Sequence, residues 1–169
     1  MSNYTRIVKT TELTEIDSKN SNFESKRNRE GDRCLFFNRE EVNELLGHEV
    51  KFYKNGVLLV LLDYAKDFTK EKNPNLKIES KSFIFYNDEK VSKVEDKKPI
   101  FEIHNRNRDK ETRILKEPVK DIEVKVCEHY LYVKESNLET NLTVEYFVDV
   151  LTGEKIFDLK DTDQISFEI

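Results

Sequence analysis

The stretch that decides the fold is Asn55-Gly56-Val57-Leu58-Leu59-Val60-Leu61-Leu62-Asp63-Tyr64. It contains six apolar residues in a row, preceded by Asn-Gly and followed by Asp. Such a run is typical of a strand that is buried on both faces. The other strand candidates are short or alternate with polar residues. We therefore expect residues 57–62 to run through the middle of the core.

The residues around this run predict its neighbours. Asn-Gly is the strongest short hairpin signal, so residues 50–53 should form the preceding strand, with Tyr53 opposite Leu58. Residues 76–86 predict the following strand. Its apolar residues change parity midway, which indicates a bulge or a break.

A helix is predicted over residues 39–46. Asn38 fits the N-cap and Glu41 fits N3, as in a capping box, and Gly47 follows at the position where helices often end. A helix of about two turns is unstable alone and has to pack on the sheet. Its apolar face would comprise Val42, Leu45 and Leu46.

The last third of the chain shows the clearest strand pattern. Residues 121–133 alternate between apolar and polar and then slip near Glu128, which indicates another bulge. Residues 142–150 alternate at period two. Turns then lead into residues 156–159 and 165–169, so we expect a three-strand antiparallel meander with one solvent-exposed face.

The predicted fold class is α+β, mostly β. We expect eight or nine strands in one or more antiparallel sheets, with the single short helix at residues 39–46. The length of 169 residues suits one domain. Residues 1–33 predict a polar N-terminal arm, and residues 34–169 a single β-rich domain with a candidate sub-boundary in the connector 87–99.

Composition favours a cytoplasmic protein. No apolar run approaches the 18 or so residues of a membrane-spanning helix, and the first residues lack the apolar stretch of a signal peptide. Cys34 and Cys127 are far apart in sequence, and we expect them to be reduced, buried thiols. Abundant Lys, Asn, Ile and Phe, which have A/T-rich codons, point to a low-GC bacterium or a phage.

Charge is concentrated at the C-terminal end. Residues 142–169 carry 2 basic and 7 acidic side chains, so this segment accounts for the whole net charge of −5. Such crowding predicts a surface that meets a positively charged partner; the alternative is an ordinary solvated sheet face. The candidate partner-binding residues are Glu145, Asp149, Glu154, Asp158, Asp161 and Asp163.

One arrangement points instead to an enzyme. A predicted helix, a strand ending in Asp63 and a strand carrying Glu79-Ser80-Lys81 follow the order of the PD-(D/E)xK nuclease core. There, two carboxylates hold a divalent metal and a lysine assists the attacking water. The helix expected after the second strand is missing, and Glu-x-Lys recurs four more times, so the arrangement does not identify a family.

The remaining clusters predict no metal and no cofactor. Cys127-Glu128-His129 contains the only close Cys/His pair, and no second pair has zinc-ligand spacing. Two basic clusters are interleaved with acidic residues in a chain of pI about 5.4, which argues against direct nucleic-acid binding. These clusters are Lys26, Arg27, Arg29 and Arg33, and Arg106, Arg108, Lys110 and Arg113.

The leading functional hypothesis is a non-catalytic protein-binding module that acts through its acidic surface. In its sharpest form it is an inhibitor that occupies the basic groove of a nucleic-acid-handling or host-defence enzyme. The enzyme alternative is the metal-dependent nuclease centred on Asp63, Glu79 and Lys81. A second alternative is a structural subunit of a larger assembly.

Overall fold

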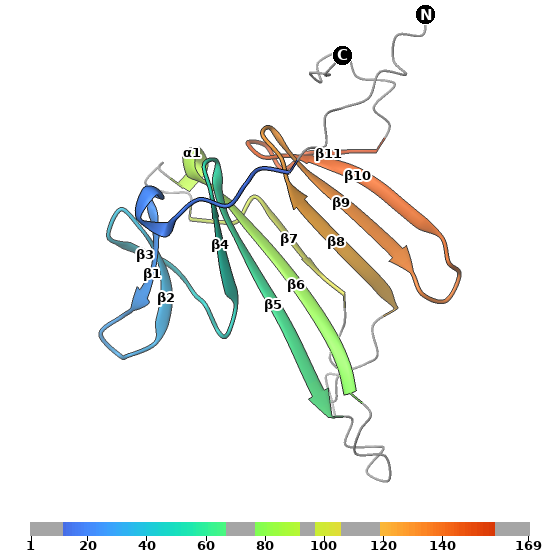
Figure 1. Cartoon of the computed structure of the whole chain (residues 1–169), viewed down its shortest axis with the longest axis horizontal. Helices are drawn as coiled ribbons and strands as arrows, with labels where there is room; N and C mark the ends of the chain where they lie inside the picture. The colour runs from blue at the N-terminus through green and yellow to red at the C-terminus, as the bar shows by residue number, and fades with distance from the viewer. Residues whose placement is uncertain (1–11, 67–76, 92–96, 106–118, 158–169) are drawn as a thin grey trace, which may run out of the picture.

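The computed structural model describes residues 12–66, 77–91, 97–105 and 119–157. In this part of the chain it contains three antiparallel sheets, of three, four and four strands, and one four-residue α-helix (Figure 1). The expectation of a mostly β protein with antiparallel pairing is confirmed. The expected number of eight or nine strands is too low, because the described residues form eleven strands, which are divided among three separate sheets.

We name the sheets by their place in the chain. The N-terminal sheet follows a short 3-10 helix, η2 (Ser18–Asn20), and has the order β1 (Phe23–Arg27), β2 (Arg33–Phe37), β3 (Glu40–Glu44). The central sheet has the order β4 (Glu49–Tyr53), β5 (Gly56–Lys66), β6 (Lys77–Asn87), β7 (Phe101–His104), and α1 (Asp88–Val91) follows β6. The C-terminal sheet has the order β11 (Lys155–Ile156), β10 (Thr143–Asp149), β9 (Tyr130–Asn137), β8 (Lys120–Val126).

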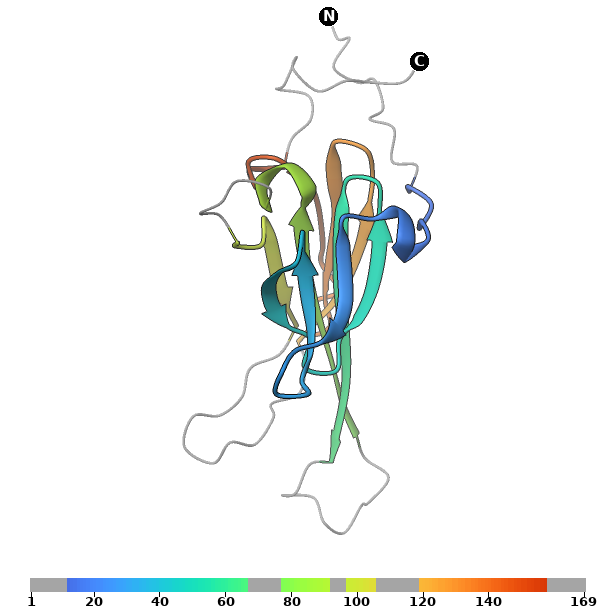
Figure 2. The ribbon, with the colours of Figure 1, turned by 90° about the vertical axis from the view of Figure 1, so that its left-hand side faces the viewer.

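The central sheet is packed on both faces. Val57 and Leu59 of β5 lie in a core shared with the N-terminal sheet, while Leu58 and Val60 lie in a core shared with the C-terminal sheet. Successive residues of a strand point to opposite faces, so a continuous apolar run fits a middle layer. The three sheets thus form three layers, with β5 in the middle one (Figures 1 and 2).

The prediction for residues 57–62 is therefore confirmed at its start and wrong at its end. Leu59 is fully buried, whereas Leu62 is 47% exposed. The two cores share no buried residue. The core towards the N-terminal sheet includes Phe23, Leu35, Phe37, Leu45, Ile84 and Tyr86, and the core towards the C-terminal sheet includes Phe83, Phe85, Ile122, Leu131, Val133, Tyr146 and Val148.

The helix predicted over residues 39–46 is wrong, because residues 40–44 form β3 and pair with β2. Asn38 and Arg39 have φ of 49° and 70°, and Leu46 and Gly47 have φ of 44° and 87°. These left-handed residues reverse the chain before and after the strand, which a helix does not allow. The supposed apolar face is split, since Leu46 is 73% exposed.

The predicted hairpin between β4 and β5 is present, with its register shifted. Tyr53 pairs with Gly56, so the turn residues are Lys54 and Asn55 rather than Asn55 and Gly56. Gly56 is needed for another reason. A Cβ at this position would lie 2.2 Å from the backbone oxygen of Tyr86 in the neighbouring strand. The glycine permits the close approach of β6.

Both predicted bulges are wrong. The pairing of β5 with β6 continues without interruption from Gly56 opposite Asn87 to Lys66 opposite Lys77. The apolar residues in the second half of β6 do not alternate with polar ones, because successive residues there lie in two different cores. The alternation of apolar and polar residues is interrupted at Glu128 because the turn between β8 and β9 lies there. Within the described residues, a register shift occurs instead between β2 and β3, beside Leu35 and Phe36.

The segment before η2 joins two sheets. The Leu13 N–H donates to the Val126 carbonyl oxygen at 2.7 Å, and the Ile16 N–H donates to the Phe52 carbonyl oxygen at 2.9 Å. Val126 belongs to edge strand β8 and Phe52 to edge strand β4. Residues 13–16 of the predicted arm are therefore bonded to these two sheets, and residues 23–27 of the arm form strand β1 of the N-terminal sheet. The domain boundary at residue 33 stays a prediction.

Of the expected C-terminal meander, β10 and β11 lie in the described part of the chain, and the strand expected at 165–169 lies outside it.

Cys34 and Cys127 are both free and buried, as expected. No helix among the described residues is long and apolar enough to cross a membrane.

Candidate binding surfaces on the two outer sheets

The face of the C-terminal sheet that points away from the core carries an aromatic strip, in which Tyr130 and Tyr132, together with the aliphatic Ile156, are partly buried and pack against the buried Phe147. The pairing of Tyr132 with Phe147, and of Phe147 with Ile156, brings three strands together in one row. The ring centroid of Phe147 lies 5.6 Å from that of Tyr132 and 6.2 Å from that of Tyr130. All four members of this cluster come from the C-terminal sheet.

Charged groups surround the aromatic strip. The Tyr132 hydroxyl donates a hydrogen bond to the Glu145 carboxylate. Lys125 Nζ lies 5.7 Å from the centroid of the Tyr132 ring and 3.5 Å from the Glu123 carboxylate. Burial, the hydrogen bond to Glu145 and the charges of Glu145 and Glu123 raise the pKa of Tyr132 to about 12. The hydroxyl therefore remains a hydrogen-bond donor at neutral pH.

The predicted acidic residues have different roles in the structure. Glu145 lies beside the aromatic strip. Asp149 Oδ1 accepts the N–H groups of Leu151 and Thr152 at 2.7 and 3.0 Å, so it stabilises the turn after β10. Glu154 is exposed in the same connection. The other three, Asp158, Asp161 and Asp163, lie outside the described residues.

The excess of negative charge is nevertheless visible in the described part. Residues 119–157, which contain the whole C-terminal sheet, carry eight acidic and four basic side chains. One of these carboxylates, that of Glu135, is partly buried. Glu135 accepts hydrogen bonds from the Tyr146 hydroxyl at 2.6 Å and from Lys120 Nζ at 3.0 Å. Burial raises the pKa of Glu135, but these two hydrogen bonds, together with the charges of Lys120 and Lys155, outweigh burial and lower it.

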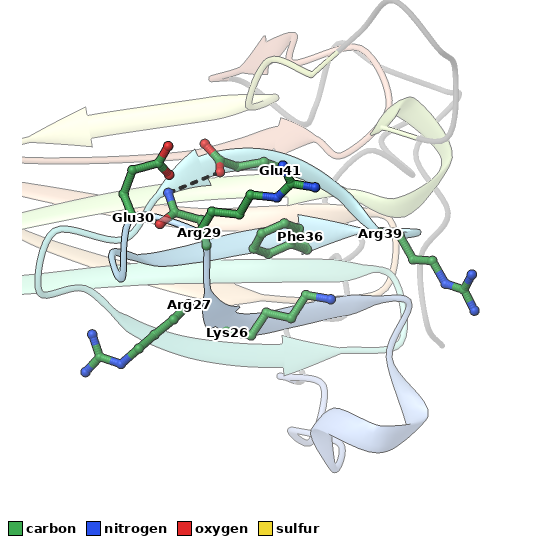
Figure 3. A pocket seen from close by; sticks show the side chains of 8 residues that line it. Lys26, Arg27, Arg29, Glu30, Phe36, Arg39 and Glu41 are labelled. Atoms are coloured by element: carbon green, nitrogen blue, oxygen red, sulfur yellow. Dashed lines mark hydrogen bonds between the residues drawn. The ribbon is translucent and has the colours of Figure 1, made fainter.

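The outer face of the N-terminal sheet is hollowed instead. The hollow has a volume of about 590 Å³ (Figure 3). We call it the basic hollow, because its lining includes four cations and two carboxylates. The lining residues are Lys26, Arg27, Asn28, Arg29, Glu30, Phe36, Arg39 and Glu41.

Phe36 forms the floor of the basic hollow. It lies in the middle strand β2, and its neighbours across the sheet are Glu24 and Glu41. Lys26 Nζ lies 4.7 Å from the centroid of the Phe36 ring, within the range of a cation–π contact. Asn28 Nδ2 donates to Glu41 Oε1 at 3.4 Å, which holds that carboxylate at one wall of the hollow (Figure 3).

One cation of the basic hollow is paired with a carboxylate, since Lys26 Nζ lies 3.8 Å from the Glu24 carboxylate. Arg27 Nη1 donates to the Gly31 carbonyl oxygen at 2.6 Å. Arg29 and Arg39 form no ion pair with the other residues that the structure describes. Of the first predicted basic cluster, only Arg33 stays out of the hollow, since its Nε donates to Ser25 Oγ at 3.0 Å. The second cluster, which begins at Arg106, lies outside the described residues.

The two cysteines are not activated. Cys34 is fully buried, and burial, together with the charges of Glu41 and Glu44, raises its pKa. Burial raises the pKa of Cys127 to about 11. A nucleophilic cysteine needs the opposite shift, because the thiolate is the reactive form.

The nuclease hypothesis concerns the far end of the β5–β6 pair. In the backbone register, Asp63 is opposite Ser80, and Glu79 is opposite Tyr64. Lys81 Nζ lies 3.5 Å from Asp121 Oδ1, so it bridges to the C-terminal sheet. The side chains of Asp63 and Glu79 lie outside the described part. Within the described part, no group of three or more His, Cys, Asp or Glu side chains could hold a metal ion.

Sequence reasoning missed the aromatic members of both surfaces. The sequence did contain a signal for Phe147, because it has the same parity as Glu145 and Asp149 and strand alternation would place it on the same face as these carboxylates. Phe36 could not be recognised in the same way, because β2 is apolar on both faces and β3 was predicted to be a helix.

Comparisons with known proteins found no matching family model, no matching curated protein and no matching solved structure.

Proposed function

We propose that the protein is a non-catalytic module that binds another protein through the outer face of its C-terminal sheet. The observation that carries the proposal is the aromatic strip, in which the partly exposed rings of Tyr130 and Tyr132 pack around the buried Phe147 on the face opposite the core. Tyrosine and other aromatic residues are enriched at the centres of protein–protein interfaces, where they contribute much of the binding energy.

The charges beside the strip favour a basic partner. Glu123 and Glu145 lie next to Tyr132, and the sheet has twice as many acidic as basic side chains. Opposite charges on two approaching surfaces accelerate association and select the partner. We therefore propose a partner with a positively charged surface, and in the sharper form of the proposal that surface is the nucleic-acid groove of an enzyme that the protein inhibits.

The experiment uses two charge-matched triple variants. Glu123→Gln/Glu145→Gln/Glu154→Gln removes charge from the C-terminal sheet and its last turn, and the glutamine introduced beside Tyr132 retains an acceptor for its hydroxyl. The control, Glu24→Gln/Glu40→Gln/Glu44→Gln, changes the net charge equally on the N-terminal sheet. The tagged wild-type chain retrieves the partner from extracts of the source cell, and association is then measured with the purified partner.

We expect the C-terminal triple variant to associate about tenfold more slowly than wild type at low salt, with a smaller difference at about 0.3 M salt. The control should associate like wild type. Equal rates for all three chains at both salt concentrations would contradict the proposal. For the inhibitor form, an oligonucleotide bound to the partner must compete with the protein, and simultaneous binding of both would exclude it.

A further inference from the structure

The basic hollow lies on the opposite side of the molecule from the aromatic strip. The central sheet packs between the N-terminal and C-terminal sheets, so their outer faces point away from each other (Figure 1). The chain has a net charge of −5, yet the hollow is lined by four cations and two carboxylates. Cations therefore outnumber carboxylates among the lining residues, although residues 23–44, which form the N-terminal sheet, carry six acidic and five basic side chains.

The shape of the basic hollow combines an aromatic floor with cations around it. Figure 3 shows the Phe36 ring between the side chains of Lys26 and Arg29, with Arg27 and Arg39 extending away at opposite ends. Phe36 is only partly buried and belongs to neither core. Its position is thus not explained by packing of the fold.

We propose that the basic hollow binds single-stranded nucleic acid, with a base stacked against Phe36 and the neighbouring phosphates held by Arg27, Arg29 and Arg39. Proteins that bind single strands combine a positively charged track for the backbone with aromatic side chains on which bases stack. Arginine is well suited to phosphate because its planar guanidinium offers several donors. Arg29 and Arg39, which form no ion pair among the described residues, are available for this role.

The carboxylates of the hollow restrict how the strand can lie. In Figure 3, Glu30 and Glu41 lie on the same side of Phe36 as Arg29, Lys26 lies on the other side, and Arg27 and Arg39 extend from the two ends. Phosphates are repelled from the acidic wall, whereas a base amino group can donate to a carboxylate there, as cytosine N4 does. The strand should therefore run from the Arg27 end to the Arg39 end with its base edges towards Glu41.

The acidic balance of the whole chain does not exclude this binding, but it limits its strength. Long-range repulsion from the C-terminal sheet is screened over about 8 Å at physiological salt, while contacts inside the hollow are shorter. Binding should be weak, confined to the N-terminal sheet and sensitive to salt.

The test measures fluorescence anisotropy of labelled single strands of RNA and DNA, about 12 nucleotides long, and of a duplex of the same sequence. Phe36→Leu keeps an apolar side chain and removes the aromatic face. Arg29→Gln/Arg39→Gln removes two exposed cations, and Lys125→Gln/Lys134→Gln is the charge-matched control on the C-terminal sheet. Circular dichroism and thermal unfolding establish that each variant folds.

We expect the wild-type chain to bind single strands more tightly than the duplex at about 0.05 M salt. Phe36→Leu should weaken binding roughly fivefold to a hundredfold, the range measured for loss of one base–aromatic stack. The double arginine variant should weaken binding and reduce the salt slope by about 1.4, or about 0.7 for each phosphate that is no longer neutralised. The control should bind like wild type.

Four results would overturn the proposal: no single-strand binding by the wild-type chain at low salt, duplex binding of equal affinity, wild-type affinity in folded Phe36→Leu, or an equal loss in the lysine control. If Phe36→Leu fails to fold, the double arginine variant decides, because both its side chains are exposed. A reduced salt slope then supports the proposal, and an unchanged slope overturns it.

Discussion

At the scale of single residues, Asp88 is the carboxyl group that the fold disfavours most clearly. It begins α1 and is half-buried, and its Oδ1 atom finds no hydrogen-bond partner among the described residues. Burial raises the pKa of Asp88 from 3.8 to about 6, a hydrogen bond from Asn22 opposes this shift, and the charge of Glu89 adds to it. Folding therefore prefers the protonated form of this side chain.

The pKa of Asp88 is higher in the folded than in the unfolded protein, so the protonated carboxyl group favours folding. This contribution to stability is complete at pH values below 3.8 and is lost as the pH rises through about 6. Asp88→Asn removes the ionisation and keeps an acceptor for Asn22. We expect the variant to be more stable than wild type at about pH 7.5, by on the order of 1 kcal/mol after allowance for solvent screening. At about pH 4 the gain should be small.

Urea unfolding at the two pH values measures this difference. The control is Glu139→Gln, which removes one negative charge from the exposed β9–β10 turn. A gain for Asp88→Asn that is the same at both pH values would show that ionisation of Asp88 is not its cause.

At the scale of elements, β5 determines the layered fold, and its two halves should respond differently to mutation. Leu59 is fully buried against the N-terminal sheet, whereas Leu62, three residues later in the same apolar run, is 47% exposed. We expect Leu59→Ala to lower the free energy of unfolding by about 2–5 kcal/mol, because it leaves a cavity in a packed core. Leu62→Ala should change it by no more than about 0.5 kcal/mol.

Chemical denaturation of the two variants under the same conditions makes this comparison. Their side chains lose the same atoms, so any difference reports burial rather than chemistry. Similar losses for both would mean that the end of the run is covered in solution.

The same strand shows what sequence could and could not predict. A continuous apolar run indicates two buried faces by its composition alone, and β5 has them. The helix prediction at residues 39–46 failed because a segment of eight residues contains too few apolar positions to separate a period of 3.6 from a period of 2. The backbone reversals at Asn38 and Leu46, together with pairing to β2, determine the strand instead.

Gly56 illustrates a second limit of sequence reasoning. Asn-Gly correctly predicted a hairpin, but the glycine is required by the nearby backbone of β6, which is 30 residues later in the chain. The two binding surfaces could not be predicted for the same reason, because strand pairing brings their residues together. Phe36 becomes part of a hollow only when β1, β2 and the turn at Asn28 lie side by side, and Phe147 meets Tyr130 and Tyr132 only through the register of β9 and β10.

At the scale of the whole molecule, the segment from Leu13 to Ile16 connects the edges of the central and C-terminal sheets. Its two backbone hydrogen bonds reach β8 and β4, and the Leu13 side chain packs on the core between these sheets. An edge strand exposes unpaired backbone groups, so a segment that bonds to two edges both closes the sandwich and protects it.

We therefore predict that two truncations will differ sharply. Deletion of residues 1–11 leaves both hydrogen bonds and Leu13 in place, and it should leave the melting temperature close to that of the full chain. Deletion of residues 1–17 removes them all. Hydrogen bonds contribute about 0.5–1.5 kcal/mol each, and the partly buried Leu13 and Ile16 add more. The melting temperature should fall on the order of 5–10 °C in a chain of this length.

Thermal unfolding followed by circular dichroism measures both truncations. Hydrogen exchange then locates the effect: amides of β4 and β8 should exchange faster in the longer truncation, while those of the N-terminal sheet, which the segment does not bridge, should be less affected. If the two truncations melt at the same temperature, the segment from Leu13 to Ile16 lies on the sandwich without stabilising it, and the two larger sheets are held together by their shared core alone.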